Sequence, residues 1–369
     1  MAEPAKRVRR PPRADGRPVV AVVGAASGPG ALLARRLAAG QDYRTVVAID
    51  AARPKGEQGA PDGADRLTWR TARIDHPDVA QTLGGVDVVV HLPGWAPPFA
   101  PHVDGRSAGA AARAVLTAAA ARGVGRAVVV TSAAVFGARA DNPLPLADDS
   151  PLRATREAPD VADLLDVEDV AAQAAITLPG MRVHVLRPAL LAGPGLDDPL
   201  QRYLAAPRLL AVRDGRTAWQ WCHLDDLLSA VELAAAGGLD ASAAAVACDG
   251  WLDRPALEAA IGRRFLEVPA AAAFGAAERL ERLGLTAAPA SQLQYALYPW
   301  ASACDRLRDG GWRPVHTNAD VLAEVLAGHR AGGLDGRSAA LGAAGAAGAT
   351  AAVLGAAVAV RRARRRRLG

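Results

Sequence analysis

A strand, a glycine-rich turn and a helix follow one another without interruption within residues 18–40. Residues 19–23 are all valine or alanine, which is typical of a parallel strand buried on both faces. Gly24, Gly28 and Gly30 come next, and residues 31–39 then place leucines on one side of a helix and arginines on the other. Such a turn lets the backbone approach a pyrophosphate, and the N-terminus of the helix attracts the anion. The segment predicts a dinucleotide-binding start to an α/β fold, with a glycine turn that holds no ligand as the alternative.

The second predicted strand, residues 45–49, ends at Asp50. An acidic residue about 20 residues past the glycines can accept hydrogen bonds from the adenosine ribose hydroxyls. Its negative charge repels a 2′-phosphate, so Asp50 favours NAD over NADP, although the cation of Arg53 lies nearby in the sequence. The alternative is a solvated loop carboxylate.

Strands and helices continue to alternate further along the chain. Strands are predicted at residues 66–74, leading to Asp75, and at 86–91, 126–131 and 182–186, with helices at 105–122 and 161–178. This alternation predicts a doubly wound parallel sheet.

The positive charge of the chain is concentrated at its two ends. The whole chain has a net charge of +5, whereas residues 1–17 carry +4 and residues 361–369 carry +6, so the body has −5. A basic groove for nucleic acid in the body is therefore not expected, and no DNA partner is predicted. Residues 1–17, rich in proline and arginine, are predicted to form a disordered basic arm.

The cysteines and the N-terminus indicate a cytoplasmic protein. Cys222, Cys248 and Cys304 are widely spaced and form neither a metal-binding pattern nor a disulfide framework, so we expect reduced thiols. The first residues are charged but lack the apolar region of a secretory signal.

Six segments occur in one order along the chain. They are GAASGPG (24–30), VDVVVHLPG (86–94), VVVTSAAVFG (128–137), VLRPALLAGPG (185–195), WQWCHLDDLLSAVELA (219–234) and CDRLRDGGWRP (304–314). In this order they resemble the extended short-chain dehydrogenases/reductases of the NAD-dependent epimerase/dehydratase type, over roughly residues 18–329. One departure is Ser27, which stands where extended members usually have the middle glycine.

The resemblance implies a Rossmann-type domain over residues 18–185 and a smaller C-terminal substrate lobe over 186–330. The composition of residues 331–369 indicates an Ala/Gly-rich segment with an Arg-rich tail. It implies NAD as the cofactor, with NADP less favoured, and relatives of this type often form homodimers. The residues that the resemblance and the turn assign to cofactor binding are Gly24, Ser27, Gly28, Gly30, Asp50, Asp75, His91, Leu92 and Pro93. The catalytic Ser/Thr of the family falls on Ser132.

The acid/base pair of the family is missing. Its Tyr-x-x-x-Lys motif places both side chains on one helix face, where the ammonium lowers the tyrosine pKa and holds the nicotinamide ribose. The only lysines here are Lys6 and Lys55, and Asp160 and Leu164 fall at the two positions of the pair. Asp160 can be an alternative acid/base or the N-cap of the helix 161–178. Ser132 can likewise be catalytic or a strand-end hydroxyl bonded to backbone.

Two further groups of polar residues have an open role. His223, Asp225 and Asp226 lie at the family's His-x-Asp-Asp position, where we expect a structural role. Arg187 either reaches a phosphate or forms an interdomain salt bridge.

The C-terminal segment has the length of a membrane span but not its composition. Residues 338–360 lack charge and include twelve alanines and four glycines, and six arginines follow. Three interpretations are open: a flexible linker to a basic tail, a segment of residues 338–367 lying on an anionic membrane surface, or a true span.

These observations lead to one main hypothesis and two alternatives. The main one is an NAD(P)-binding protein that has lost standard hydride chemistry and has a sensing or regulatory role, with an unknown small-molecule ligand. The first alternative is an active NAD-dependent epimerase or oxidoreductase on a nucleotide-sugar or sterol-like substrate, using Ser132 with Asp160 or a water. The second is a membrane- or RNA-associated adaptor that uses the basic ends.

Overall fold

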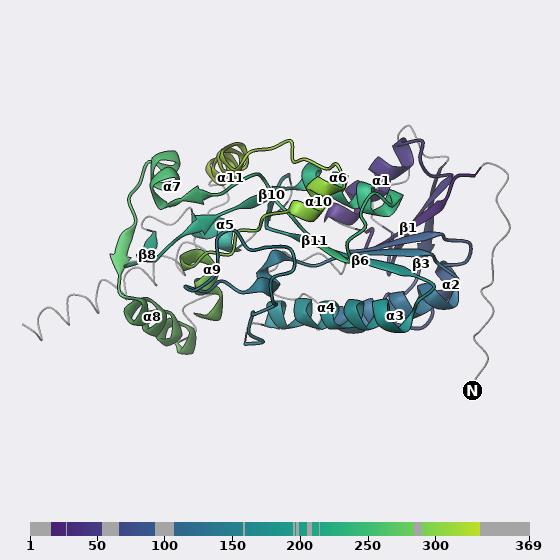
Figure 1. Cartoon of the computed structure of the whole chain (residues 1–369), viewed down its shortest axis with the longest axis horizontal. Coiled ribbons are helices and arrows are strands. Elements are labelled where there is room, and N and C mark those ends of the chain that lie inside the picture. The colour runs from purple at the N-terminus through teal and green to yellow at the C-terminus, as the bar shows by residue number, and fades with distance from the viewer. Residues whose placement is uncertain are drawn as a thin grey trace, which may run out of the picture.

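Seven strands form one parallel sheet in the order β11-β6-β5-β4-β1-β2-β3 (Figure 1). The computed structural model describes residues 16–332, apart from residues 27, 54–65, 93–106, 158, 195, 197–198, 205–208, 214 and 284–289. The strands are β1 (Val19–Val23), β2 (Thr45–Asp50), β3 (Leu67–Thr71), β4 (Val88–His91), β5 (Arg126–Val130), β6 (Arg182–Pro188) and β11 (Ala243–Val246). The sheet grows outward in both directions from β1 and β4, which is the doubly wound Rossmann arrangement.

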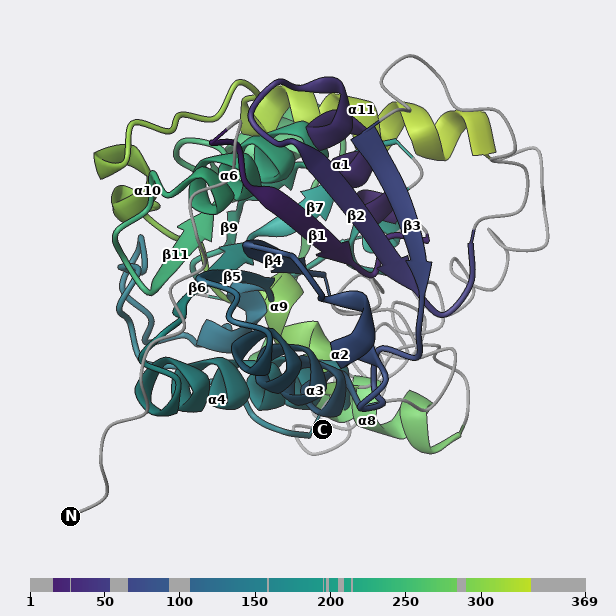
Figure 2. The same cartoon turned by 90° about the vertical axis from the view of Figure 1, so that its right-hand side faces the viewer.

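Helices cover both faces of the sheet because alternate strand residues point to opposite sides. In β1, Val20 and Val22 belong to one apolar cluster, whereas Val19, Ala21 and Val23 belong to another. The first cluster packs against α1 and α6, and the second against α2, α3 and α4 (Figure 2). The bounds of these helices are α1 (Gly28–Ala39), α2 (Val79–Thr82), α3 (Ala108–Ala121), α4 (Pro159–Thr177) and α6 (Leu224–Ala236).

The rest of the described chain forms a smaller assembly beyond the C-terminal ends of the strands. Three two-stranded sheets pair β7 (Leu190–Ala192) with β10 (Trp221–His223), β9 (Ala218–Trp219) with β12 (Leu252–Asp253), and β8 (Leu210–Val212) with β13 (Leu266–Val268). The accompanying helices are η2 (Ala133–Phe136), α5 (Pro199–Tyr203), α7 (Arg254–Ile261), α8 (Ala270–Arg282), η3 (Ala290–Gln292), α9 (Leu293–Leu297) and α11 (Asn318–Gly332). An apolar cluster that includes Trp219, Trp221 and Tyr295 fills this part. The short helix α10 (Asp305–Asp309) packs instead against β11 of the large sheet.

The predicted fold class is confirmed, with two differences in detail. The third strand is β3 (Leu67–Thr71), shorter than the predicted 66–74, because it lies at the edge of the sheet and has a neighbour on one side only. The last strand, β11, comes from beyond residue 185, where the Rossmann domain was predicted to end. The other predicted domain limits stay predictions.

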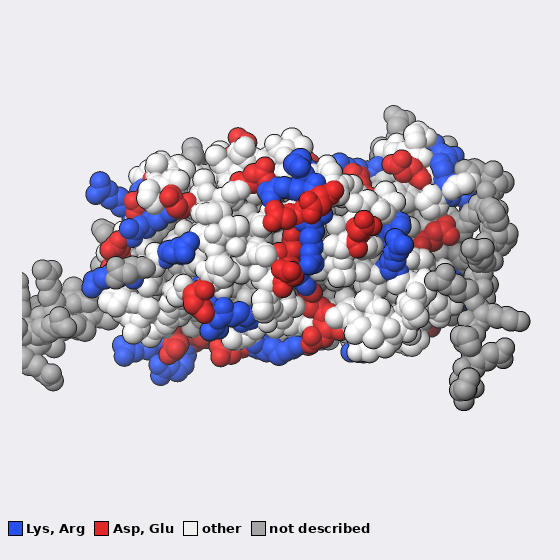
Figure 3. Space-filling model, viewed as in Figure 1, with Lys and Arg blue, Asp and Glu red and all other residues white. Residues whose placement is uncertain are grey.

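Acidic and basic side chains are interspersed on the face shown in Figure 3. Near the middle of that face, where Figure 1 places α10, both signs meet. Ion pairs of α10 account for part of this band: Arg306 pairs with Asp149, and Arg308 with Asp249 and Asp305.

Among the described helices, none combines the length and the apolar composition needed to cross a membrane. The predicted basic arm (apart from residues 16 and 17) and the segment 338–367 lie outside the described residues, so the membrane and RNA interpretations stay predictions.

Candidate cofactor site and its surroundings

The three glycines of the turn differ in what surrounds them. Gly24 has a φ of +91°, and a Cβ there would lie 2.2 Å from the backbone oxygen of Leu92. A Cβ on Gly30 would lie 2.0 Å from the backbone oxygen of Gly24. Gly28 also has a positive φ, +52°, but nothing lies within 4 Å of its Cβ position. Gly24 therefore lets the turn lie against Leu92 after β4, and Gly30 lets α1 pack against the end of β1. The middle glycine leaves open space at the N-terminus of α1, where a phosphate would approach.

Asp50 lies against the same turn. Its Oδ2 accepts a hydrogen bond of 2.9 Å from the backbone N–H of Ala26, and its Oδ1 accepts one of 2.7 Å from Ala51. The structure thus brings together the glycine turn and the acidic residue that the sequence assigned to the cofactor. The guanidinium of Arg53 lies 5.9 Å from the centre of the Trp69 ring, a cation–π contact with β3.

Asp75 lies four residues past the end of β3, in the turn before α2, rather than directly after a strand. Its Oδ2 is 3.3 Å from Nη2 of Arg73. Its role toward a cofactor stays a prediction. Ser27 and Pro93 lie outside the described residues.

His91 and Leu92 lie at the carboxyl end of β4, next to the glycine turn. His91 ends β4 between Val23 of β1 and Val129 of β5, and neither of its ring nitrogens has a hydrogen-bond partner among the residues that the structure describes. Burial lowers its pKa from 6.5 to about 4. The backbone N–H of Leu92 donates to Val23. The imidazole of His91 is therefore neutral at pH 7 and enclosed among strands.

Because of this burial, we expect the free energy of unfolding to fall as the pH drops from 6.5 toward 4. In that window the unfolded chain binds a proton at His91 that the folded chain does not bind, since the folded pKa lies below the unfolded one. The loss is about 2 kcal/mol at pH 5. Denaturant unfolding at pH 7 and pH 5 would measure it in the wild type and in His91→Leu.

Comparing the wild type with His91→Leu isolates the contribution of His91 to the pH dependence of stability, because the other titrating groups are common to both proteins. His184, whose pKa burial also lowers, is one of them. His76→Asn serves as the matched control, since that imidazole is exposed. An equal loss of stability in wild type and His91→Leu would contradict the expectation.

Ser132 follows β5 and is 1% exposed. Its Oγ accepts a 3.1 Å hydrogen bond from the backbone N–H of Ala134, as the N-cap of η2, and donates one of 3.4 Å to the backbone oxygen of Pro188. These contacts favour the backbone-bonded interpretation of this hydroxyl, and a catalytic role stays a prediction.

The helix expected to carry the acid/base pair begins earlier than predicted. It starts at Pro159, so Asp160 lies within its first turn, and the N-cap interpretation of Asp160 is wrong. A proline is well suited to this first position because the N–H it lacks would be unpaired there. Leu164, at the family's lysine position, is partly buried and packs against an apolar cluster that includes Val135 and Val161.

Arg187 forms a buried ion pair, which is the salt-bridge alternative predicted for it, and its partner Glu168 was missed in the sequence. Nε and Nη2 of Arg187 donate to the two carboxylate oxygens of Glu168 at 2.9 and 2.8 Å. Thr131 Oγ1 donates to the same carboxylate at 2.7 Å, and Arg187 Nη1 donates to the backbone oxygen of Asp148. Arg187 therefore ties β6 to α4 and is not free for a phosphate. The sequence pattern that could have indicated burial of Glu168 is its place on the apolar stripe of α4, seven residues after Val161.

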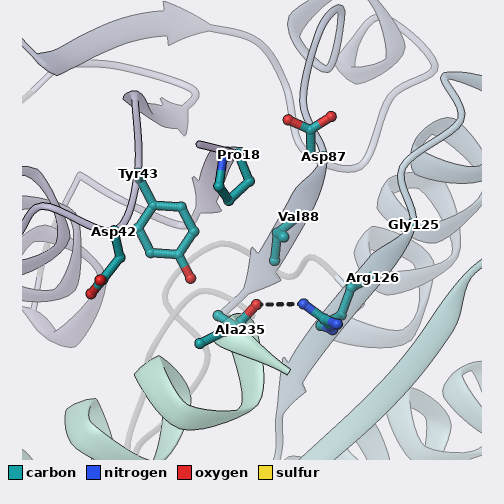
Figure 4. Close-up of a pocket in the computed structure, with 9 residues that line it drawn as sticks. Pro18, Asp42, Tyr43, Asp87, Val88, Gly125, Arg126 and Ala235 are labelled. Atoms are coloured by element: carbon teal, nitrogen blue, oxygen red, sulfur yellow. Dashed lines mark hydrogen bonds between the residues drawn. The ribbon is translucent and has the colours of Figure 1, made fainter. Parts of the chain in front are cut away.

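A pocket of about 420 Å³ lies at the amino ends of the strands, opposite to the end of the sheet where the glycine turn lies (Figure 4). Its lining includes Pro18, Val88 and Arg126, at the amino ends of β1, β4 and β5, whereas the glycine turn follows the carboxyl end of β1. Arg126 Nη1 donates to the backbone oxygen of Ala235 at 2.8 Å. Burial raises the pKa of Tyr43, which also lines the pocket, to about 12. None of the predicted site residues lies in this lining.

A doubly wound parallel sheet with a glycine turn between its first strand and first helix defines a dinucleotide-binding fold. The chain belongs to the NAD dependent epimerase/dehydratase family, whose model matches residues 20–242. An uncharacterized protein of Mycobacterium tuberculosis (strain H37Rv) is 30% identical over 350 residues, which cover 88% of this chain and 89% of that protein. An uncharacterized protein of Mycobacterium bovis is similar to the same extent.

Solved structures share the fold. The dTDP-glucose 4,6-dehydratase DesIV from Streptomyces venezuelae, with NAD and TYD bound, has a TM-score of 0.60 and 22% identity, over 87% of this chain and 99% of that one. The UDP-glucose 4-epimerase of Thermotoga maritima has a TM-score of 0.58 and 15% identity, over 85% and 99% of the two chains. At these identities the likeness establishes the fold.

Proposed function

We propose that this protein binds NAD or NADH as a sensor or regulator and does not carry out the hydride chemistry of its family. The observation that carries the proposal is Leu164, which packs against an apolar cluster at the position of the family's lysine. The described part of the chain contains no lysine at all, because Lys6 and Lys55 both lie outside it. Within residues 16–332 as the structure describes them, no lysine ammonium is therefore available to lower the pKa of an acid/base or to hold the nicotinamide ribose.

The adenosine half of the cofactor fits the residues that are present. Gly28 leaves open space at the N-terminus of α1 for the pyrophosphate, and Asp50 beside the turn can accept hydrogen bonds from the ribose hydroxyls. When bound, NAD would supply a nicotinamide ring able to accept or donate a hydride. The chain's own residues thus support binding through the adenosine half and leave the reactive half without its usual anchor.

Binding is tested by calorimetric titration of the full-length chain with NAD, NADH, NADP and NADPH. We expect micromolar binding of NAD and NADH and weaker binding of the phosphorylated forms. Gly28→Asp should weaken binding about 100-fold, because its carboxylate would lie close to the pyrophosphate and repel it.

Gly123→Asp is the matched control. Gly123 also has a positive φ, +70°, and nothing within 4 Å of its Cβ position, but it follows α3 at the amino edge of the sheet. The two substitutions therefore cost similar backbone strain and differ in their distance from the turn. No binding of any of the four dinucleotides, or equal binding by both variants, would refute the cofactor proposal.

An active enzyme on a nucleotide sugar is the second candidate, favoured by structural neighbours that are nucleotide-sugar dehydratases and epimerases. Incubation of the NAD-loaded protein with dTDP-glucose or UDP-glucose, followed by sugar analysis, separates the two candidates. We expect no conversion. Conversion that Ser132→Ala abolishes would instead establish the enzyme, with Ser132 in its catalytic role.

A further inference from the structure

Two histidines from distant parts of the chain meet at the start of α11. His223 ends β10 and caps α6, and His316 precedes α11, which packs against β10 (Figure 1). Their rings are stacked, with centroids 3.7 Å apart and planes inclined by 29°. His223 is buried and His316 is partly exposed. The pair is therefore enclosed on one side and accessible on the other.

Each imidazole has one nitrogen next to a carboxylate. His316 Nδ1 is 3.0 Å from Oδ2 of Asp226, a buried residue that also accepts the backbone N–H groups of Val315 and His316. His223 Nε2 is 3.2 Å from Oε2 of Glu324. A neutral histidine that donates one N–H to a carboxylate keeps a lone pair on its other nitrogen, which is the usual arrangement around a bound metal. In this arrangement the lone pairs are on Nε2 of His316 and on Nδ1 of His223.

Asp225 lies beside the two histidines as a third candidate ligand. Oδ2 of Asp225 is 3.7 Å from His223 Nδ1, and the ligand atoms of His223, Asp225 and His316 all lie within 4.8 Å of one another. The present contact of His223 Nδ1 is a 3.2 Å hydrogen bond from the backbone N–H of Asp225, which a metal would replace. With ligand bonds of about 2.0–2.2 Å, small side-chain rotations are enough to close the cluster on one ion.

We propose that His223, Asp225 and His316 bind a divalent transition metal of the Zn²⁺ class. Two imidazoles and one carboxylate suit such an ion better than Ca²⁺ or Mg²⁺, which prefer oxygen ligands. Asp226 and Glu324 orient the two rings and add negative charge that favours a cation. The ion would join the N-terminus of α6 to the segment that leads into α11. This site is independent of the cofactor proposal.

The test is titration of the chelator-treated, full-length protein with Zn²⁺, followed by calorimetry and by metal analysis after gel filtration. We expect one bound ion per chain, a rise in melting temperature on Zn²⁺ addition, and visible absorption bands of tetrahedral Co²⁺ when Co²⁺ replaces Zn²⁺. Asp225→Asn, at an exposed position, and His316→Asn, which can still donate to Asp226, should each weaken binding at least tenfold.

His76→Asn is the matched control, because His76 forms a comparable pair with Asp78, Nδ1 to Oδ2 at 2.9 Å, on another surface. It should bind Zn²⁺ as the wild type does. Absence of a bound ion in the wild type would overturn the proposal, as would unchanged binding in Asp225→Asn and His316→Asn. Circular dichroism of each variant establishes that loss of binding does not come from loss of fold.

Discussion

Replacing Glu168 by glutamine should lower the free energy of unfolding by about 3–5 kcal/mol, because it leaves the Arg187 guanidinium buried without its counter-charge. The side chains of Arg187 and Glu168 are 9% and 5% exposed, so water cannot take the place of the carboxylate. Guanidinium chloride unfolding of the full-length variant and of the wild type measures the difference.

The size of this effect follows from how completely the pair is enclosed. Arg187 makes two hydrogen bonds to Glu168, one to the backbone of Asp148 and a cation–π contact with Phe136, 5.2 Å from the ring centre. Thr131 adds a hydrogen bond to the carboxylate. Together these contacts join the carboxyl ends of β5 and β6 to α4, close to Ser132.

Two comparison variants separate the effect of burying an unpaired charge from the effect of losing an ion pair in general. Glu232→Gln removes the partner of Arg36 on the surface, where both side chains are partly exposed, and should cost at most about 1 kcal/mol. The double variant Glu168→Met with Arg187→Met removes both buried charges and should recover much of the stability that Glu168→Gln loses. A loss below about 1 kcal/mol in Glu168→Gln would contradict the argument.

Local patterns were sufficient to predict the sheet and the turn. Runs such as residues 19–23 and 88–90 are apolar throughout because a parallel sheet buries both faces, so their strands were predicted to within a few residues. The edge strand β3 was predicted less well, since only one of its sides is paired and its sequence is mixed. The absence of the Tyr-x-x-x-Lys pair required no structure, because the chain has only two lysines.

Contacts between distant segments could not be predicted in the same way. The pairing of Glu168 with Arg187 depends on how α4 lies on the sheet, and the stacking of His223 on His316 depends on how α11 packs against β10. Neither pair has a spacing that local geometry fixes. Of the three side chains that we propose as metal ligands, His223 and Asp225 lie in the His-x-Asp-Asp segment that the sequence analysis singled out, but nothing in the sequence marks His316 as their neighbour.

Gly30→Ala should lower the free energy of unfolding by about 3 kcal/mol, the upper end of the range for an overpacked site. The added methyl would lie 2.0 Å from the backbone oxygen of Gly24 and 2.8 Å from its carbonyl carbon, so backbone rather than a flexible side chain must move. Thermal and denaturant unfolding measure the loss, and NAD titration of the folded fraction should show weaker binding because α1 is displaced from the turn.

Gly275→Ala is the comparison that tests whether close packing causes the loss of stability in Gly30→Ala. Gly275 also lies inside a helix, α8, but nothing surrounds its Cβ position within 4 Å, so alanine there should raise stability by about 0.5–1 kcal/mol through higher helix propensity. The same chemical change thus has opposite signs in two helices, because only α1 is pressed against the end of β1. Equal effects of the two substitutions would mean that α1 can move away from the turn at little cost, and that close packing at Gly30 does not position the candidate phosphate site.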